Sequence, residues 1–308
     1  MKIILIALII LLIITLIIKN NNNKESFNDI PVIIKGEKFQ ELADIYIGTN
    51  DEFKYNPKIL NTKIKQIDIN EIPYNYDNPK LIFCYTRLIY ELNNKLDRFN
   101  NNFILITGNS DENIKDNPII NKLINNSKIV KWYTQNLSIF NDKCIPIPIG
   151  IQNDMHLKKE SIIYFNNELI NTYHLNKTEN VFFNFNKNTN SNRNECFNKL
   201  KNKLKFLENT DYLENIKRLS KYKFCICPEG NGFDTHRLWE CYYVQTIPIV
   251  LNTPFIQVLI KHINLPIVLL NSWDDFSEEK LNYSYNFDNK YYELLDFNYY
   301  KKLIYKFV

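Results

Sequence analysis

The stretch from Lys223 to Val250, KFCICPEGNGFDTHRLWECYYVQTIPIV, constrains the fold of this 308-residue chain more than any other. An apolar run is followed by a polar loop with two glycines, a helical pattern and a second apolar run. Two strands that are joined through a helix pair in parallel, so the stretch predicts a β-α-β unit. Ligands of parallel sheets bind at loops of this kind, and the helix N-terminus behind the loop attracts anions.

The same alternation continues through most of the chain. We expect strands at 81–85, 103–107, 129–133, 181–185, 247–251 and 266–270, and helices at 88–99, 119–124, 161–173, 193–204, 212–220 and 254–262. An extended segment at 144–149 ends at Gly150, and a second α/β series follows it. The sequence therefore predicts two Rossmann-like lobes with parallel sheets, at 31–157 and 158–285, and a C-terminal helix at 286–308.

The N-terminus predicts a membrane anchor. Residues Ile3 to Ile18 are apolar apart from Thr15, and Lys2 and Lys19 flank them. We expect a transmembrane signal-anchor helix at 1–19 and a polar stalk at 20–30, since no small residues suited to cleavage follow. A buried core helix is the alternative. An anchor of this length suits a thin ER or Golgi-type membrane and would make the protein single-pass type II.

Charge and cysteine spacing narrow the choice of partners. The net charge is +4 and the lysines are scattered, so nucleic acid is not an expected partner. The six cysteines form no C-x-x-C pair, which argues against a structural zinc site. Cys225 and Cys227 are expected in the core, although one or two disulfides are possible in an oxidising lumen. The sequons at Asn125, Asn136 and Asn176, with a fourth at Asn282, carry little weight in an Asn-rich chain.

Ten residues are candidates for binding an anionic ligand. Arg237 and Arg193 can hold phosphate through two hydrogen bonds each, and Glu240 can reach sugar hydroxyls. The full set is Thr189, Asn190 and Arg193 in the loop after 181–185, and Gly230, Asn231, Gly232, Thr235, His236, Arg237 and Glu240 in the loop and helix after 223–227. Each has a plainer alternative: an ordinary tight turn, a solvated helix start, or an i, i+3 ion pair between Arg237 and Glu240.

A catalytic base is expected from the first lobe. Asp111 follows a strand, and Asp154 and His156 lie near the junction of the two series. All three are also residue types typical of turns and caps. Asp274 and Asp275 are expected to cap a helix. Since the chain contains no Asp-x-Asp triplet, we expect neither a metal nor another cofactor at the ligand site.

One part of this pattern resembles a known family. Phe224-Cys225 with Pro228, Arg237-Leu238-Trp239-Glu240, and Ile247-Pro248-Ile249-Val250 are similar to the C-terminal motif of exostosin-like glycosyltransferases. The likeness covers about thirty residues and extends more weakly through ILITGNSD, CIPIPIGI and Trp273-Asp274-Asp275. Cys241 and Gln245 depart from the small residue and the glycine that family members usually have. The resemblance implies a GT-B arrangement, with Arg237 at the diphosphate and Glu240 at the ribose of a nucleotide-sugar.

The expected function is therefore transfer of a hexosyl or pentosyl group from a nucleotide-diphosphate sugar to a hydroxyl of a glycan or glycoprotein. The alternative is an inactive homologue that serves as a membrane-tethered binding or structural protein. The chain lacks G-x-G-x-x-G and G-x-x-x-x-G-K-[ST], which argues against a dehydrogenase or a P-loop kinase.

Overall fold

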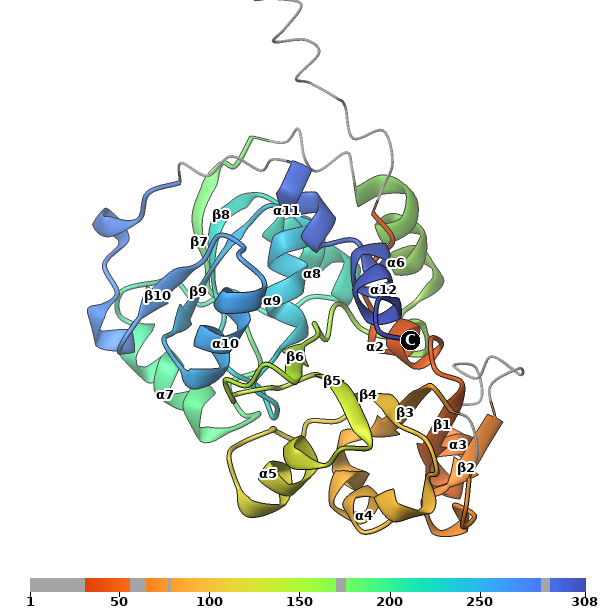
Figure 1. Ribbon diagram of the computed structural model, residues 1–308. Helices are drawn as coiled ribbons and strands as arrows, with labels where there is room; N and C mark the ends of the chain where they lie inside the picture. Colours follow the sequence, from red (N-terminus) through yellow and green to blue (C-terminus); the bar gives the residue numbers. More distant parts are fainter. Residues whose placement is uncertain (1–30, 56–64, 77–78, 170–175, 284–288) are drawn as a thin grey trace, which may run out of the picture. The chain divides into compact units, whose positions relative to one another are not determined.

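Two parallel sheets carry the α/β fold of this chain, as the alternation of strands and helices predicts (Figure 1). The computed structural model describes residues 31–55, 65–76, 79–169, 176–283 and 289–308. These ranges belong to one compact unit, Pro31–Val308. The expected anchor at 1–19 and stalk at 20–30 lie outside the described residues. Within the described ranges no helix combines the length and the apolar character that crossing a membrane requires.

The first lobe holds a six-stranded sheet in the order β2-β1-β3-β4-β5-β6, with every pair parallel. All residues of β3 and β4 are buried, because their apolar runs are covered on both faces. The order reverses at β1, which places a topological switch point between β1 and β3. The strands are β1 (Ile45–Gly48), β2 (Lys65–Asp68), β3 (Leu81–Tyr85), β4 (Phe103–Gly108), β5 (Ile129–Thr134) and β6 (Cys144–Pro146).

Short helices connect these strands. The turn α2 (Gly36–Gln40) precedes the sheet, and α3 (Asn50–Tyr55) follows β1. The region 88–99, expected as one helix, is broken: α4 covers only Ile89–Asn93, and 3₁₀ turns flank it. Asn93 and Asn94 favour capping over helix continuation, which explains the break. The helix expected at 119–124 is confirmed as α5 (Pro118–Asn125), which Asn117 caps.

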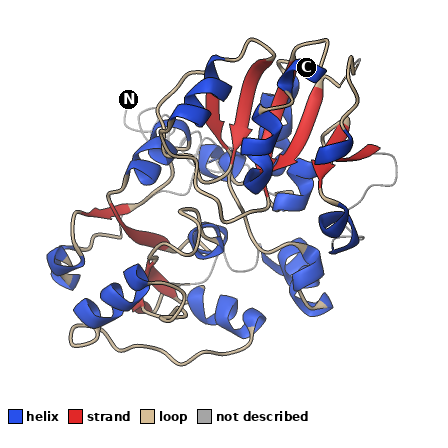
Figure 2. Ribbon diagram, turned by 90° about the horizontal axis from the view of Figure 1, so that it is seen from below, coloured by secondary structure: helices blue, strands red, loops and turns tan. Residues whose placement is uncertain are grey.

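The second lobe holds a four-stranded sheet in the order β10-β9-β8-β7, again parallel throughout. Figure 2 shows its strands as a group separate from those of the first sheet, with helices beside each group. Asp211 caps α8, and Thr253 with the following proline starts α10. The elements are β7 (Glu179–Phe182), β8 (Tyr222–Ile226), β9 (Ile247–Leu251), β10 (Val268–Leu270), α7 (Ser191–Leu200), α8 (Tyr212–Leu219), α9 (His236–Tyr243) and α10 (Pro254–His262).

Several expected boundaries are wrong by a few residues. The strand expected at 181–185 ends at Phe182, and the one expected at 266–270 begins at Val268. Only Cys144–Pro146 of the extended segment 144–149 pairs with a neighbour, because its prolines have no N–H group for a sheet. The helix expected at 161–173 is α6 (Lys159–Ile163) and a π-helical turn, Tyr164–Glu168, and its last four residues lie outside the described ranges.

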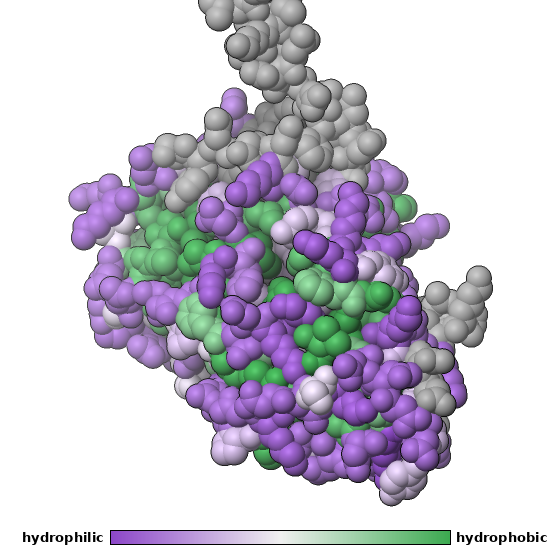
Figure 3. All heavy atoms as spheres, viewed as in Figure 1, coloured by the Kyte–Doolittle hydropathy of each residue, from purple (hydrophilic) through white to green (hydrophobic). Residues whose placement is uncertain are grey.

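The second sheet is less completely covered than the first. Its core contains Phe183, Phe224 and Ile249, all buried. On the face seen in Figure 3, hydrophobic side chains reach the surface over β8 to β10. Leu269 of β10 is 43% exposed and the flanking Val268 is only partly buried, as suits a strand at the sheet edge.

The C-terminal segment returns to the first lobe. It forms α11 (Asn289–Leu294) and α12 (Phe297–Tyr305) instead of a single helix. Figure 1 shows α12 beside α2, where Phe39 packs edge-on against Phe297 and Tyr300. The hydroxyl of Tyr133 on β5 donates to the carbonyl of Leu303 (3.0 Å). The C-terminal helix α12 therefore completes the core of the first lobe.

Replacing Phe39 tests this packing. The ring is fully buried, so Phe39→Ala leaves a cavity and should lower the free energy of unfolding by about 3–5 kcal/mol. Phe140→Ala, at a side chain that is 52% exposed, should change it by no more than about 0.5 kcal/mol. Guanidinium denaturation measures both, and equal midpoints for the two variants would contradict the docking of α12.

Candidate functional site

Two loops meet at the carboxyl edge of the second sheet, as the sequence predicts. Because β7 and β8 are parallel neighbours, the loop after each strand emerges on the same side. The Asn190 side chain donates to the carbonyl of Gly230, and Arg193 Nε donates to the carbonyl of Glu229 (3.0 Å). Arg193 Nη1 also contacts the Thr189 hydroxyl (3.2 Å). The two candidate loops thus form one wall.

Arg193 is a cation that lacks a carboxylate partner. Its hydrogen bonds run to carbonyls and a hydroxyl, and no carboxylate of the described part of the chain forms an ion pair with it. Burial lowers the pKa of the Arg193 guanidinium, and the positive charge of Arg237 lowers it further. Two guanidinium groups therefore share one partly buried environment, which favours an anion between or beside them.

Arg237 forms the i, i+3 ion pair that was the plainer alternative. Its Nε lies 3.0 Å from Glu240 Oε2, and its Nη1 donates to the carbonyl of Asn184 (2.7 Å). Burial is the largest single effect and would lower the pKa of Arg237, but the Glu240 carboxylate and the sulfurs of Cys225, Cys241 and Cys227 together raise it. Glu240 is only 4% exposed. The pair keeps Arg237 charged, and both side chains still line a cavity.

Two cavities adjoin at this wall. One, of about 300 Å³, lies at the second lobe, and the other, of about 370 Å³, lies at the switch point of the first sheet. Both are lined by Asp111, Ile149 and His236, so they lie next to each other. The second-lobe cavity is also lined by Thr189, Arg193, Gly230, Asn231, Gly232, Thr235, Arg237 and Glu240, which includes nearly all of the expected ligand set.

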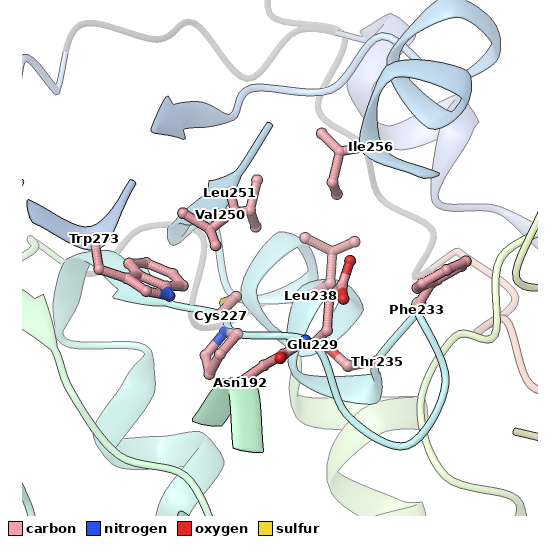
Figure 4. Close-up of a pocket in the computed structure, with 11 residues that line it drawn as sticks. Asn192, Cys227, Glu229, Phe233, Thr235, Leu238, Val250, Leu251, Ile256 and Trp273 are labelled. Atoms are coloured by element: carbon pink, nitrogen blue, oxygen red, sulfur yellow. The ribbon is translucent and has the colours of Figure 1, made fainter. Parts of the chain in front are cut away.

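A third cavity lies behind the loop and is mostly apolar. Figure 4 shows Val250, Leu251, Leu238 and Ile256 around it, with Trp273 at one side and Cys227 below. Its volume is about 30 Å³, which is close to the space of a single water molecule. It cannot hold a sugar nucleotide, so the two larger cavities are the candidate site.

The glycine loop is tied to the first lobe. Phe233 N donates to Asn113 Oδ1 (2.8 Å), and Asp234 N donates to Asn136 Oδ1 (2.7 Å). Asn231 Nδ2 lies 3.3 Å from Asp111 Oδ2. Gly230 N bonds within the loop, to the carbonyl of Gly232 (3.1 Å). The N–H groups of 230, 233 and 234 are therefore occupied within the protein and cannot serve a bound phosphate.

The glycines serve packing more than unusual backbone angles. Gly232 has no positive φ, but a Cβ there would come within 2.9 Å of the Asn136 amide. Gly150 is the glycine with a positive φ, +68°, and a Cβ there would meet the carbonyl of Ile34 at 2.0 Å. Asn136 itself is 2% exposed, which rules out its sequon as a glycan acceptor in the folded protein.

Asp234 is the main site residue that the sequence did not reveal. Its carboxylate accepts Ile149 N (2.8 Å) from the first lobe and Trp239 Nε1 (2.8 Å) from α9. Burial raises the pKa of Asp234 to about 7, although these hydrogen bonds oppose the rise. The loop sequence contained the acid, but its partners are 85 and 5 residues away along the chain. Only the folded chain brings them together.

His236 has a fixed tautomer. Its Nδ1 lies 2.8 Å from the carbonyl oxygen of Gly150, and a carbonyl can only accept. Nδ1 therefore carries the hydrogen, which leaves Nε2 as the acceptor of a neutral ring. Since His236 lines both cavities, the ring can accept a proton from, or donate one to, a group bound there.

The structure separates the three base candidates. Asp111 lines both cavities, whereas His156 lines only the one at the first sheet. Asp154 pairs with the ammonium of Lys35, whose side chain is 3% exposed, and it lines neither cavity. The arrangement thus brings Asp111 and His236 together and leaves Asp154 in an ion pair at the edge.

Two further expectations concern residues around the site. All six cysteines are buried and free, so the possible disulfides are not formed, and Cys225 and Cys227 lie in the core as expected. Asp275 accepts Ser272 N (3.0 Å) in a capping box, as expected. Asp274 instead pairs with Lys199 (2.7 Å) at the surface.

Comparisons with known proteins add no relative. No protein-family model matches the chain, and no curated protein matches it significantly.

The raised pKa of Asp234 predicts a dependence of stability on pH. Its ordinary value is 3.8 and its folded value is about 7, so the folded state binds an extra proton between these pH values. The stabilisation is complete below about pH 4 and is lost as the pH rises through 7. The stability advantage of the wild type over Asp234→Asn should be about 2–3 kcal/mol larger at pH 5 than at pH 8. Urea denaturation at the two pH values measures it, and parallel pH profiles would contradict the assignment.

Proposed function

We propose that the chain is a membrane-anchored glycosyltransferase of GT-B type, which transfers a sugar from a nucleotide-diphosphate donor to a hydroxyl of a glycan or glycoprotein. The observation that carries the proposal is the position of Arg193 and Arg237 at one cavity, at the carboxyl edge of a parallel sheet. The Glu240 carboxylate neutralises one of the two charges. The remaining positive charge suits a diphosphate.

The donor would lie in the second-lobe cavity. Arg193 and Arg237 would hold the diphosphate and stabilise the charge that develops on it as the sugar leaves. Thr189, Asn190 and Thr235 would supply neutral hydrogen bonds around it, and Glu240 would accept from a sugar hydroxyl. The guanidinium groups would perform the charge neutralisation that a metal performs elsewhere, so we propose no metal at this cavity.

The acceptor would enter from the first-lobe cavity. The proton of its hydroxyl would pass to Asp111 or to Nε2 of His236, because both line the two cavities. Residues 1–19 would anchor the enzyme as a single-pass type II protein in an ER or Golgi-type membrane. The acceptor cavity would then face the lumen, where nascent glycans are found.

A membrane-tethered binding protein without turnover is the second candidate. Two observations favour it: the loop N–H groups at 230, 233 and 234 are occupied within the protein, and Arg237 already has a carboxylate partner. Such a protein would bind the nucleotide-sugar or a glycan but would not release a nucleoside diphosphate. A turnover assay with any donor that binds separates the two candidates.

Donor binding is tested by thermal shift with UDP-, GDP- and CMP-sugars. At least one nucleotide should raise the melting temperature of the purified full chain. Arg193→Ala should weaken that binding at least tenfold, since it removes a cation without leaving an unpaired carboxylate. Arg218→Ala is the matched control, because Arg218 lies on α8, bonds the carbonyl of Glu208 and lines neither cavity. The proposed donor site would be wrong if no nucleotide raised the melting temperature, or if Arg193→Ala and Arg218→Ala lost the same nucleotide affinity.

The proton acceptor is tested by His236→Asn and Asp111→Asn. The shorter amide at 236 can keep the hydrogen bond to Gly150 while it removes the acceptor at Nε2. If His236 is the base, this variant should lose about 10²–10⁴-fold in kcat with little change in donor affinity, and Asp111→Asn should lose much less. The reverse order would assign the base to Asp111. Full kcat in both variants would exclude a role for either residue.

A further inference from the structure

Three buried thiols form a cluster behind the glycine loop. Cys225 lies in β8, Cys227 follows that strand directly, and Cys241 lies in α9. Their Sγ atoms all lie within 4.8 Å of one another, and the pair from Cys227 and Cys241 is 3.6 Å apart. The three residues are 0%, 5% and 0% exposed. Neither of the two large cavities includes them.

We propose that Cys225, Cys227 and Cys241 bind a thiophilic divalent cation of the zinc class. In such sites each sulfur lies about 2.3 Å from the metal, which places the sulfur atoms about 3.8–4.0 Å apart. The Cys227–Cys241 separation of 3.6 Å is close to that value, and no two of the three sulfurs are more than 4.8 Å apart. The strand and the helix therefore already hold the three sulfurs near the spacing of such a site.

The neighbouring charges suit a divalent ion. Binding releases the thiol protons to solvent and leaves three thiolates, which with Glu240 carry four negative charges. The cation supplies two positive charges and Arg237 a third, so three of the four negative charges are balanced without Arg193.

A tetrahedral ion needs a fourth ligand. Cys227 lines the small cavity of about 30 Å³ seen in Figure 4, which has room for about one water molecule. A water there would lie beside Cys227, the member of the cluster that lines this cavity. The three thiolates and this water complete the coordination expected for zinc or cadmium.

The spacing argument against a structural zinc site does not apply to this cluster. That argument depended on the lack of a C-x-x-C pair. In this cluster Cys225 and Cys227 are separated by a single residue, and Cys241 comes from the following helix, α9. The three sulfurs come together because α9 follows β8 in the chain and packs against β9, the neighbouring strand of the same sheet. The inference is independent of the nucleotide site, for which we propose no metal.

A disulfide between Cys227 and Cys241 is the competing fate of these thiols. Their sulfurs would have to close from 3.6 Å to about 2.05 Å, and an oxidant would have to take two electrons and two protons. It would also leave Cys225 without a role. The two fates differ in mass and in metal content, so one experiment distinguishes them.

The test titrates the reduced full chain with Cd²⁺ and follows the ultraviolet thiolate-to-cadmium charge-transfer band. One cadmium per chain should bind, with release of protons into an unbuffered solution. Cys225→Ser, Cys227→Ser and Cys241→Ser should each weaken binding at least a hundredfold. Cys196→Ser and Cys144→Ser are matched controls at buried cysteines outside the cluster, and they should leave the affinity unchanged.

X-ray absorption on the wild-type cadmium complex covers the case in which a serine variant does not fold. Three sulfur neighbours about 2.5 Å from the metal would support the site, and one or none would overturn it. Absence of the band while all six thiols are reduced would also overturn it. So would an intact mass lower by two hydrogens in protein purified without reductant, with a Cys227–Cys241 peptide link.

Discussion

The carboxylate of Asp234 fixes the geometry on which the candidate site depends. It accepts one hydrogen bond from the first lobe, at Ile149 N, and one from α9, at Trp239 Nε1. The backbone of the same residue donates to Asn136 of the first lobe. Asp234, Trp239 and Asn136 are buried, and a buried polar group that loses its partner costs about 1–3 kcal/mol. The N-terminal end of α9 can therefore shift relative to the first lobe only if several of these hydrogen bonds break together. The positions of His236, Arg237 and Glu240 follow from this constraint, since all three lie on α9.

This constraint changes what a glycine-rich loop means in this chain. The sequence pattern suggests a loop whose free N–H groups surround a phosphate. In the fold, the middle of the loop faces the first lobe, and Gly232 is required because Asn136 approaches so closely. In the proposed donor site, anion binding would then fall to side chains of the wall, above all to Arg193. The loop acts mainly as a spacer that holds two cavities side by side, with Asp111 and His236 at their common border.

The sequence predicted what depends on local pattern and on the rules of parallel sheets. The β8–loop–α9–β9 unit lies where it was expected, and the loops after β7 and β8 meet because parallel neighbours share a carboxyl edge. Asp211 and Thr253 cap their helices, since capping involves partners only a few residues away. The pairing of Asp234 with Ile149, the role of Gly150 and the three-thiol cluster could not be predicted. Their partners come from separate elements, and no spacing along the chain encodes the distance between them.

The charges around α9 link the two sides of that helix. Arg237 faces the anion cavity, where it lines the wall with Arg193, yet it also acts on the thiol of Cys225 behind the loop. A guanidinium in that position must stay charged to serve either side, and the buried Glu240 ensures this by raising its pKa. Arg193, which lacks such a partner, contributes the charge that remains unbalanced when the thiols are protonated. In the proposed donor site the two arginines therefore have different roles. Arg237 is held in place by the Glu240 carboxylate, and Arg193 supplies the net attraction for an anion. An Arg193 paired with its own carboxylate would leave the cavity neutral and remove the physical reason for an anion to bind there.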